Sequence, residues 1–123
     1  ELIYGVFHRR QIYVAQKKLE IRGRDEIINV ENIGSIPKSA NIRFHVYPGI
    51  ELIKTRDGSI LLNHKKGFVW KLSAKNRNIS IQESVMFTPK GLLPCKQIII
   101  NIKLDKIRAY KTISCDWLFQ LQE

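Results

Sequence analysis

Hydrophobic and polar residues alternate along most of this 123-residue chain. From Val6 to Val14 the even positions form one face and the odd positions form the other, and the alternation returns over Asn41–Tyr47 and Ile79–Thr88. A two-residue period with β-branched and aromatic members predicts β-strands. No segment shows a convincing helical period of about 3.6 residues, so the pattern predicts no helix.

Turn residues separate the predicted strands at short intervals. Arg56-Asp57-Gly58 is the best hairpin turn, because Gly after Asp suits a positive φ. Loops are predicted over residues 29–39 and 89–94, which both contain Gly and Pro. The predicted strands are Val6–Val14, a strand with Leu19, Ile21 and Gly23 on one face, Asn41–Tyr47, Ile50–Thr55, Ser59–His64, a strand with Phe68, Trp70 and Leu72 on one face, Ile79–Thr88, Lys96–Leu104, Ile107–Ser114 and Trp117–Leu121. Many short strands of this kind predict an all-β fold, an antiparallel β-sandwich of about nine or ten strands that spans residues 1–123 as one domain.

The chain has the composition of a globular domain, since 44% of its residues are hydrophobic. Lys96–Leu104 is almost continuously apolar, which predicts a strand that is covered on both faces. No stretch approaches the roughly 18 apolar residues of a membrane-spanning helix. The chain opens at Glu1 without an initiator methionine, so we expect a fragment or domain of a larger protein, and the compartment stays open.

The net charge of +10 favours anionic partners. The basic residues are nevertheless scattered, with only short pairs such as Lys17-Lys18 and Lys65-Lys66, and scattered lysines are also typical of solvated strand faces and protected sheet edges. A nucleic-acid-binding module would rest on charge alone. It ranks last, because aromatic residues make up only 9% of the chain and form no clustered recognition pattern.

One strand face carries candidate ligand-binding chemistry. Arg43, His45 and Tyr47 alternate onto the same side, where a guanidinium could pair with the carboxylate or sulfate of an acidic sugar. The alternative is a structural face that packs against a neighbouring domain. Arg10 is a fourth candidate, on a strand that also carries His8. The structural interpretation of that strand is a polar end to a buried element, with the imidazole hydrogen-bonded to the backbone.

No catalytic or metal-binding pattern is present in the sequence. His8, His45 and His64 are far apart, whereas zinc needs three or four convergent ligands. We therefore predict no metal, no cofactor and no catalytic residue in this chain. Cys95 and Cys115 match neither a CxxC nor a zinc spacing, and we interpret them as free thiols.

An ordered series of segments runs from Gly5 to Phe119: GVFHRRQIYV with IRGRDEI, IRFHVYPGIEL, DGSILL with GFVWKL, ISIQESVMF, and CKQIII. The series resembles the segments "GLxHxRxLxL … GED", "IRFHLHP", "DG–VLL" with "GW-F", "LEESVY" and "TEQIV" of heparinase II/III-like proteins. Two positions depart from that pattern. Tyr47 replaces the second His of "RFHxHP", and Arg24 replaces the usual Glu after Gly23.

The resemblance implies the architecture of a polysaccharide lyase, an α/α toroid followed by a large antiparallel β-sandwich. This chain would be the C-terminal part of that β-region. Such enzymes cleave acidic polysaccharides by β-elimination: the uronate carboxylate is neutralised, a base removes the adjacent carbon-bound proton, and the glycosidic oxygen leaves. The family's catalytic Tyr and His residues and its His/Asp metal ligands lie upstream. No segment here matches them.

The resemblance thus implies a non-catalytic role, structural and in contact with substrate. The expected partners are the catalytic toroid of the parent protein and acidic polysaccharide, and the family location would be the periplasm or cell envelope. The alternative is a stand-alone basic β-sandwich module that binds acidic polysaccharide or another polyanion. A fragment cut from a larger β-region should expose apolar strand edges or faces, and such surfaces favour a dimer.

Overall fold

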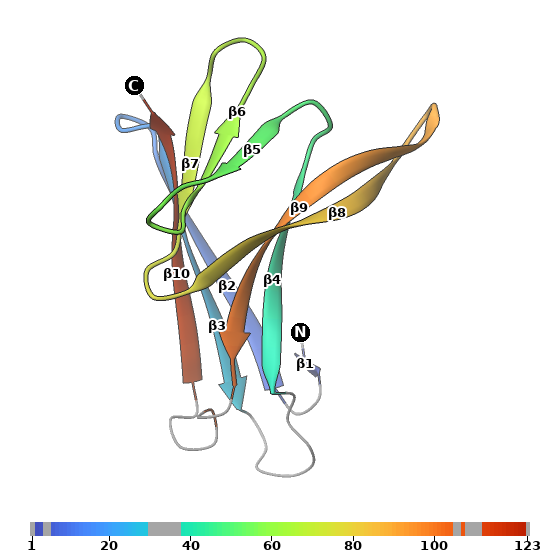
Figure 1. Cartoon of the computed structure of the whole chain (residues 1–123). Coiled ribbons are helices and arrows are strands. Elements are labelled where there is room, and N and C mark those ends of the chain that lie inside the picture. Colours follow the sequence, from blue (N-terminus) through green and yellow to red (C-terminus); the bar gives the residue numbers. More distant parts are fainter. Residues whose placement is uncertain (1, 4–5, 30–37, 105–106, 108–111, 123) are drawn as a thin grey trace.

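The computed structural model describes residues 2–3, 6–29, 38–104, 107 and 112–122, and these form two antiparallel β-sheets (Figure 1). The large sheet has the strand order β1-β2-β3-β10-β7-β6-β5, and the small sheet has the order β4-β9-β8. The strands are β1 Leu2–Ile3, β2 Val6–Ala15, β3 Glu20–Asn29, β4 Ser39–Val46, β5 Glu51–Lys54, β6 Ile60–Asn63, β7 Val69–Ser73, β8 Asn78–Thr88, β9 Gly91–Lys103 and β10 Thr112–Gln122. The predicted all-β antiparallel sandwich is confirmed.

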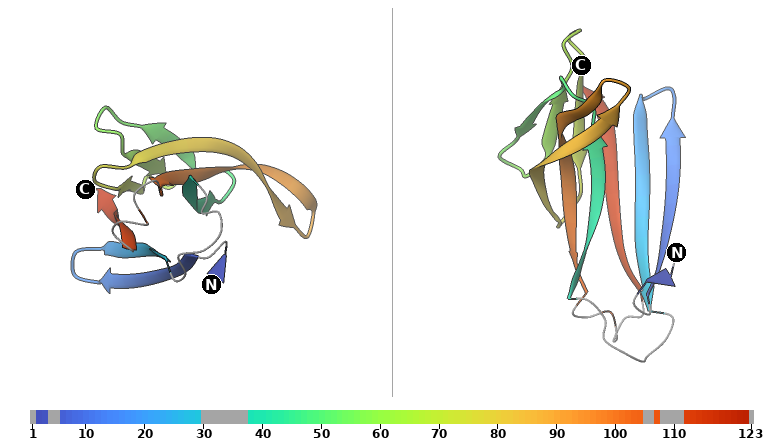
Figure 2. Two further views of the ribbon diagram at one scale, coloured as in Figure 1. Left: turned by 90° about the horizontal axis from the view of Figure 1, so that it is seen from below. Right: turned by 90° about the vertical axis from the view of Figure 1, so that its right-hand side faces the viewer.

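The hydrophobic core lies between the two sheets. Figure 2 shows β2 and β3 on one side of the molecule and β4, β8 and β9 on the other. Ile98, Ile100 and Ile102 of β9 are fully buried in this space, as is Ile60 from the large sheet. Burial of one such side chain stabilises the fold by roughly 1.5–3 kcal/mol. The alternating isoleucines of β9 therefore supply a large share of the core.

The central strand of the small sheet is buried on both faces, as the apolar run predicted. β9 lies between β4 and β8. Its inner face carries Ile98 and Ile100, while Cys95 and Ile99 on the opposite face are also buried. The uninterrupted run of apolar residues, rather than a clean alternation, follows from this central position.

The predicted loop over residues 89–94 is confirmed only for its first two residues, which form a turn, and is wrong for residues 91–94, which belong to β9. β8 and β9 form one long hairpin with Thr88 opposite Gly91, and Gly91 turns the chain at a φ of 106°. Pro94 lies within β9, although proline removes a ladder donor. It is tolerated because the pairing of β4 with β9 ends at Lys96, which leaves one edge of β9 without a partner strand at Pro94.

The prediction of two separate strands at the C-terminal end, Ile107–Ser114 and Trp117–Leu121, is also wrong. β10 runs unbroken from Thr112 to Gln122, because it pairs with β3 along nearly its whole length and with β7 near its end. Of the predicted strand Ile107–Ser114, residues 108–111 lie outside the described part. So do residues 30–37 of the predicted long loop, whose flanks belong to β3 and β4.

The predicted Asp-Gly hairpin joins β5 and β6. Gly58 has a φ of 85°, and Thr55 exchanges backbone hydrogen bonds with the turn through Ser59 O and Gly58 N. The carboxylate of Asp57 accepts hydrogen bonds from the Thr55 hydroxyl and from Ser59 N, and it pairs with Lys71. These contacts hold the pKa of Asp57 far below its usual range. Asp57 is therefore ionised at neutral pH.

No helix in the described part of the chain combines the length and the apolar character that crossing a membrane requires.

Candidate functional site

The register of three neighbouring strands brings polar side chains together inside the large sheet. Arg10 of β2 lies directly opposite Asp25 of β3, and Trp117 of β10 lies opposite Gly23. Alternation along β3 sends Gly23, Asp25 and Ile27 to the same inward face, so a carboxylate enters the interior. An ionised group in this position needs charge partners and hydrogen bonds.

Four residues, His8, Arg10, Asp25 and Trp117, form what we call the Asp25 cluster. Asp25 is fully buried. Its Oδ1 accepts a hydrogen bond from Arg10 Nε at 2.8 Å, and His8 Nε2 lies 2.6 Å from the same oxygen. Its Oδ2 accepts a hydrogen bond from Trp117 Nε1 at 2.8 Å. Both carboxylate oxygens are therefore engaged, one toward β2 and one toward β10.

The partners of Asp25 determine its protonation state. Burial alone raises the pKa of this carboxyl group, because the charged form loses its hydration. The hydrogen bonds from Arg10, His8 and Trp117 favour the charged form and together outweigh burial, so the pKa of Asp25 lies below its ordinary value. The cluster holds an ionised aspartate inside the sandwich.

The cluster also connects the two sheets. The Arg10 guanidinium carbon lies 5.5 Å from the centre of the Phe44 ring and 6.0 Å from that of Trp117. The rings of Phe44 and Trp117 meet edge to face, with centroids 5.1 Å apart. Phe44 belongs to β4 in the small sheet, so Arg10 joins a buried anion of one sheet to an aromatic ring of the other. Such cation–π contacts contribute about 0.5–2 kcal/mol.

This geometry suits a structural role better than proton transfer. A general base must have a free lone pair within reach of a substrate proton, whereas Asp25 is fully buried and both of its oxygens already accept hydrogen bonds. The alternation in the sequence predicted Leu19, Ile21 and Gly23 on one face, and Asp25 is the next residue of the same alternation. An acidic residue at an inward-facing position of a strand is the sequence signal from which this buried cluster could have been predicted.

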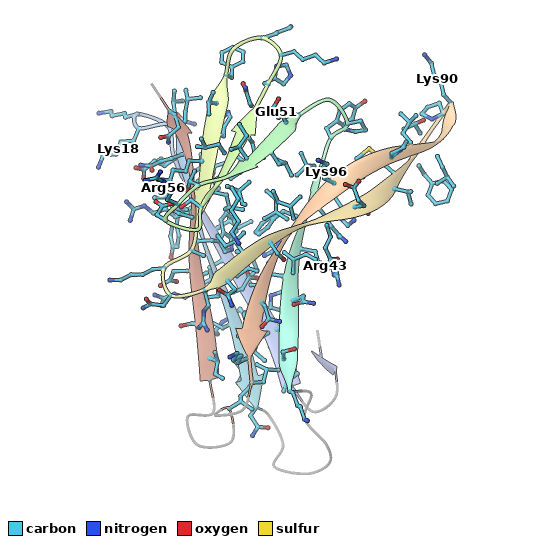
Figure 3. The ribbon with its side chains drawn as sticks, viewed as in Figure 1. Lys18, Arg43, Glu51, Arg56, Lys90 and Lys96 are labelled. Carbon is cyan, nitrogen blue, oxygen red and sulfur yellow. The ribbon has the colours of Figure 1, made fainter. Side chains whose placement is uncertain are left out.

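The predicted ligand-binding residues lie on two different surfaces. Arg43 (labelled in Figure 3) and His45 lie on the side of β4 that faces away from the core, and Tyr47 comes directly after the last residue of that strand. All three are exposed, and we call them the β4 polar face. Arg10 is not part of this surface. It lies on the inner side, where it contacts Asp25 and Phe44.

The β4 polar face continues across the small sheet. Strand register places His45 beside Gln97 and Gln82, and places Arg43 in the same row as Ser80. Gln82 and Ser80 are exposed, whereas Gln97 is buried. The outer side of the small sheet therefore offers a cation, an imidazole, a phenol and neutral hydrogen-bonding groups to solvent.

The family follows from a comparison of the sequence with known protein families. The model "Heparinase II/III-like, C-terminal" matches residues 3–117. The chain belongs to the heparinase II/III-like family. A search of curated proteins and a search of solved structures returned no match. The matched span contains the Asp25 cluster and the β4 polar face. A C-terminal region of this family implies a parent protein that also carries a catalytic domain.

The three histidines of this heparinase II/III-like domain lie in three different parts of the structure. His8 joins the Asp25 cluster, His45 lies on the β4 polar face, and His64 receives a hydrogen bond from Lys66 N in the turn after β6. Among the described residues, no three His, Cys, Asp or Glu side chains gather in a way that could hold a metal ion. Cys95 and Cys115 are both buried and free.

Proposed function

We propose that this chain is a non-catalytic β-sandwich domain of a heparinase II/III-like polysaccharide lyase. It forms the C-terminal part of the parent, supports the catalytic toroid and contacts the acidic polysaccharide on which the parent acts. The observation that carries the non-catalytic part is the state of Asp25: this buried, ionised carboxylate is committed to joining β2, β3 and β10. A charge used in this way holds strands together and does not accept a substrate proton.

The β4 polar face is the first candidate for contact with polysaccharide. Arg43 can pair with a carboxylate or sulfate, and Tyr47, which is 68% exposed, can stack on a sugar ring or donate a hydrogen bond. The alternative role of this face is packing against the catalytic domain. Both roles fit a domain that lies beside a polysaccharide-cleaving partner.

An ultraviolet assay tests the catalytic silence directly. Lyases of this class leave an unsaturated uronate, which absorbs in the ultraviolet, so the purified chain should give no signal with an acidic polysaccharide. The parent protein with its catalytic domain is the positive control. Steady formation of unsaturated product by the purified chain would refute the catalytic silence.

A second candidate function is a stand-alone module that binds polyanions. The net charge of +10 supports it, because such a charge attracts acidic partners without any help from a catalytic domain. The coding sequence immediately upstream of Glu1 separates the two. The lyase proposal expects a toroid there with "HGH"-like and "DPG"-like segments, whereas a stop codon and an unrelated gene would favour the stand-alone module.

A further inference from the structure

A hollowed basic surface lies on the side of the sandwich around the turn that joins β7 to β8. Three adjoining hollows, with volumes of about 680, 330 and 570 Å³, all include Lys75 in their walls. The first reaches Lys103 of β9, and the third reaches Tyr13 of β2. We call this continuous surface the basic groove. It runs from the edge of the small sheet onto the outer face of the large sheet.

Cations outnumber acids along the basic groove. Its cationic wall residues are Arg22, Arg24, Lys75, Arg77 and Lys103, and its acidic ones are Asp57 and Asp116. Both acids are already paired: Asp57 with Lys71 at 3.2 Å, and Asp116 with Arg24 at 2.6 Å. Lys75 and Lys103 are exposed and have no ion-pair partner within the described part of the chain. Among the described residues, no acid therefore neutralises the two positive charges of Lys75 and Lys103 in the first hollow.

The groove is distinct from the other basic residues of the chain. Lys18, Arg56 and Lys90 lie in turns between β2 and β3, between β5 and β6, and between β8 and β9, and Figure 3 shows Lys90 at the opposite side of the view from Lys18 and Arg56. Lys75 and Lys103, by contrast, line a single hollow although they are far apart in sequence. Concave surfaces of one charge sign raise the local concentration of an oppositely charged ligand more than isolated surface charges do.

The uncharged groups of the groove indicate which kind of polyanion fits. Asn76 and Asn78 are exposed beside Lys75, and amides donate to and accept from sugar hydroxyls. Tyr13, which is 66% exposed, is the exposed aromatic ring among the described wall residues. Proteins that bind single-stranded nucleic acid usually stack successive bases on several aromatic rings. A charged wall with amides and one ring therefore favours an acidic polysaccharide.

We propose that the basic groove binds acidic polysaccharide, with Lys75 and Lys103 holding its carboxylate or sulfate groups and Asn76 and Asn78 bonding its sugar hydroxyls. This inference rests on the polysaccharide part of the proposed function and gives that contact a location. It assigns the main contact to a surface built by the turn between β7 and β8 and by the end of β9. The β4 polar face then contributes less.

Calorimetric titration of the full chain with alginate and heparin oligosaccharides tests the assignment. The groove variant is Lys75→Ser with Lys103→Ser, two exposed residues whose loss should leave the fold intact, as circular dichroism verifies. The matched control is Lys65→Ser with Lys66→Ser, which removes the same charge from the turn after β6. A third variant, Arg43→Ser with His45→Ser, changes the β4 polar face. Neutral dextran and single-stranded DNA are the comparison ligands.

We expect the groove variant to bind at least one acidic oligosaccharide roughly tenfold more weakly, the loss that follows when charge-assisted hydrogen bonds are removed. The control should lose less than about twofold, the effect of net charge alone. Unchanged binding by the groove variant, with loss in the β4 variant, overturns the groove and leaves the proposed function standing. Failure of the wild-type chain to bind either acidic ligand overturns both. Equal binding of DNA with the same groove dependence overturns the choice of polysaccharide.

Discussion

The indole ring of Trp117 occupies the space that a side chain on Gly23 would need. A Cβ built on Gly23 would lie 2.0 Å from Cζ2 of that ring, far inside van der Waals contact. The two residues are direct neighbours across β3 and β10. Only a glycine lets the indole come this close to β3, and the approach is what brings Nε1 within hydrogen-bond distance of Asp25.

Replacement of Gly23 by alanine should destabilise the protein by about 2–3 kcal/mol, because overpacking forces a rigid ring out of its place. Urea denaturation monitored by tryptophan fluorescence would measure the change. Ser80→Ala at an exposed strand position is the control and should change stability by less than about 0.5 kcal/mol. The penalty should shrink when Trp117 is first replaced by leucine. An equal penalty in both backgrounds would place the strain elsewhere.

Loss of the Asp25 charge should leave its partners unsatisfied. Asp25→Asn keeps the shape but offers a single oxygen to donors that now use two, and an unpaired buried partner costs about 1–3 kcal/mol. We therefore expect a loss of about 2–3 kcal/mol in the free energy of unfolding. Glu83→Gln at an exposed position is the matched control. Equal stability of wild type and Asp25→Asn would mean that the cluster contributes no net stabilisation.

The same cluster predicts a pH dependence of stability. The pKa of Asp25 is lower in the folded chain than in the unfolded chain, so its stabilising contribution is fully present above the unfolded pKa of about 4. That contribution is lost as the pH falls through the lower folded-state pKa. The stability gap between wild type and Asp25→Asn should thus be widest near neutral pH and narrow in acid. Urea titrations from neutral to acidic pH would show it, and a constant gap would contradict the argument.

The fold was predictable wherever local pattern and turn chemistry determine it. The alternation over Val6–Val14 and the Asp57-Gly58 turn gave strands and a hairpin that the structure confirms. The predictions that failed are those in which tertiary pairing overrides a local signal. Proline is typical of loops, but Pro94 lies within β9. It pairs with β8 on one side, and the pairing of β9 with β4 on the other side has already ended at Lys96.

The sites depended on information that a single sequence does not contain. The alternation correctly placed Arg43, His45 and Tyr47 on one side, because that requires only period two. Lys75 and Lys103 share one hollow only because the chain crosses from β7 in one sheet to β8 in the other. That crossing is a property of strand order, which no local pattern specifies. Arg10 was singled out as a ligand-binding residue, and its opposite neighbour Asp25 became visible only with the register.

Both thiols should be unreactive in the folded protein. Cys115 is 1% exposed, and burial raises the pKa of its thiol, which lowers the fraction of reactive thiolate. Cys95 is buried on the outer side of β9. We expect iodoacetamide followed by mass spectrometry to label neither residue in native buffer and both in urea. A Ser80→Cys variant provides an exposed thiol as the control. Rapid native labelling at Cys115 would mean that β10 opens locally.

The end of the β8–β9 hairpin should mediate self-association. Figure 1 shows this ribbon extending away from the rest of the fold. Phe87 pairs with Leu92 on one face, and these side chains are 86% and 57% exposed, an apolar surface that lies beyond the end of β4 pairing. Burial of such surface between two copies is favourable, whereas the net charge of +10 on each copy opposes it. The dimer should therefore strengthen as salt screens the repulsion.

Analytical ultracentrifugation over a range of protein and salt concentrations would measure this association. The double variant Phe87→Ser with Leu92→Ser should stay monomeric under conditions in which the wild type dimerises. Because both side chains are exposed in the single chain, the variant should unfold within about 0.5 kcal/mol of the wild type at low protein concentration. Phe44→Ser, which removes a ring from the contact between the sheets, should cost about 3 kcal/mol instead. A wild type that stays monomeric at high protein and salt concentrations would contradict the predicted dimer.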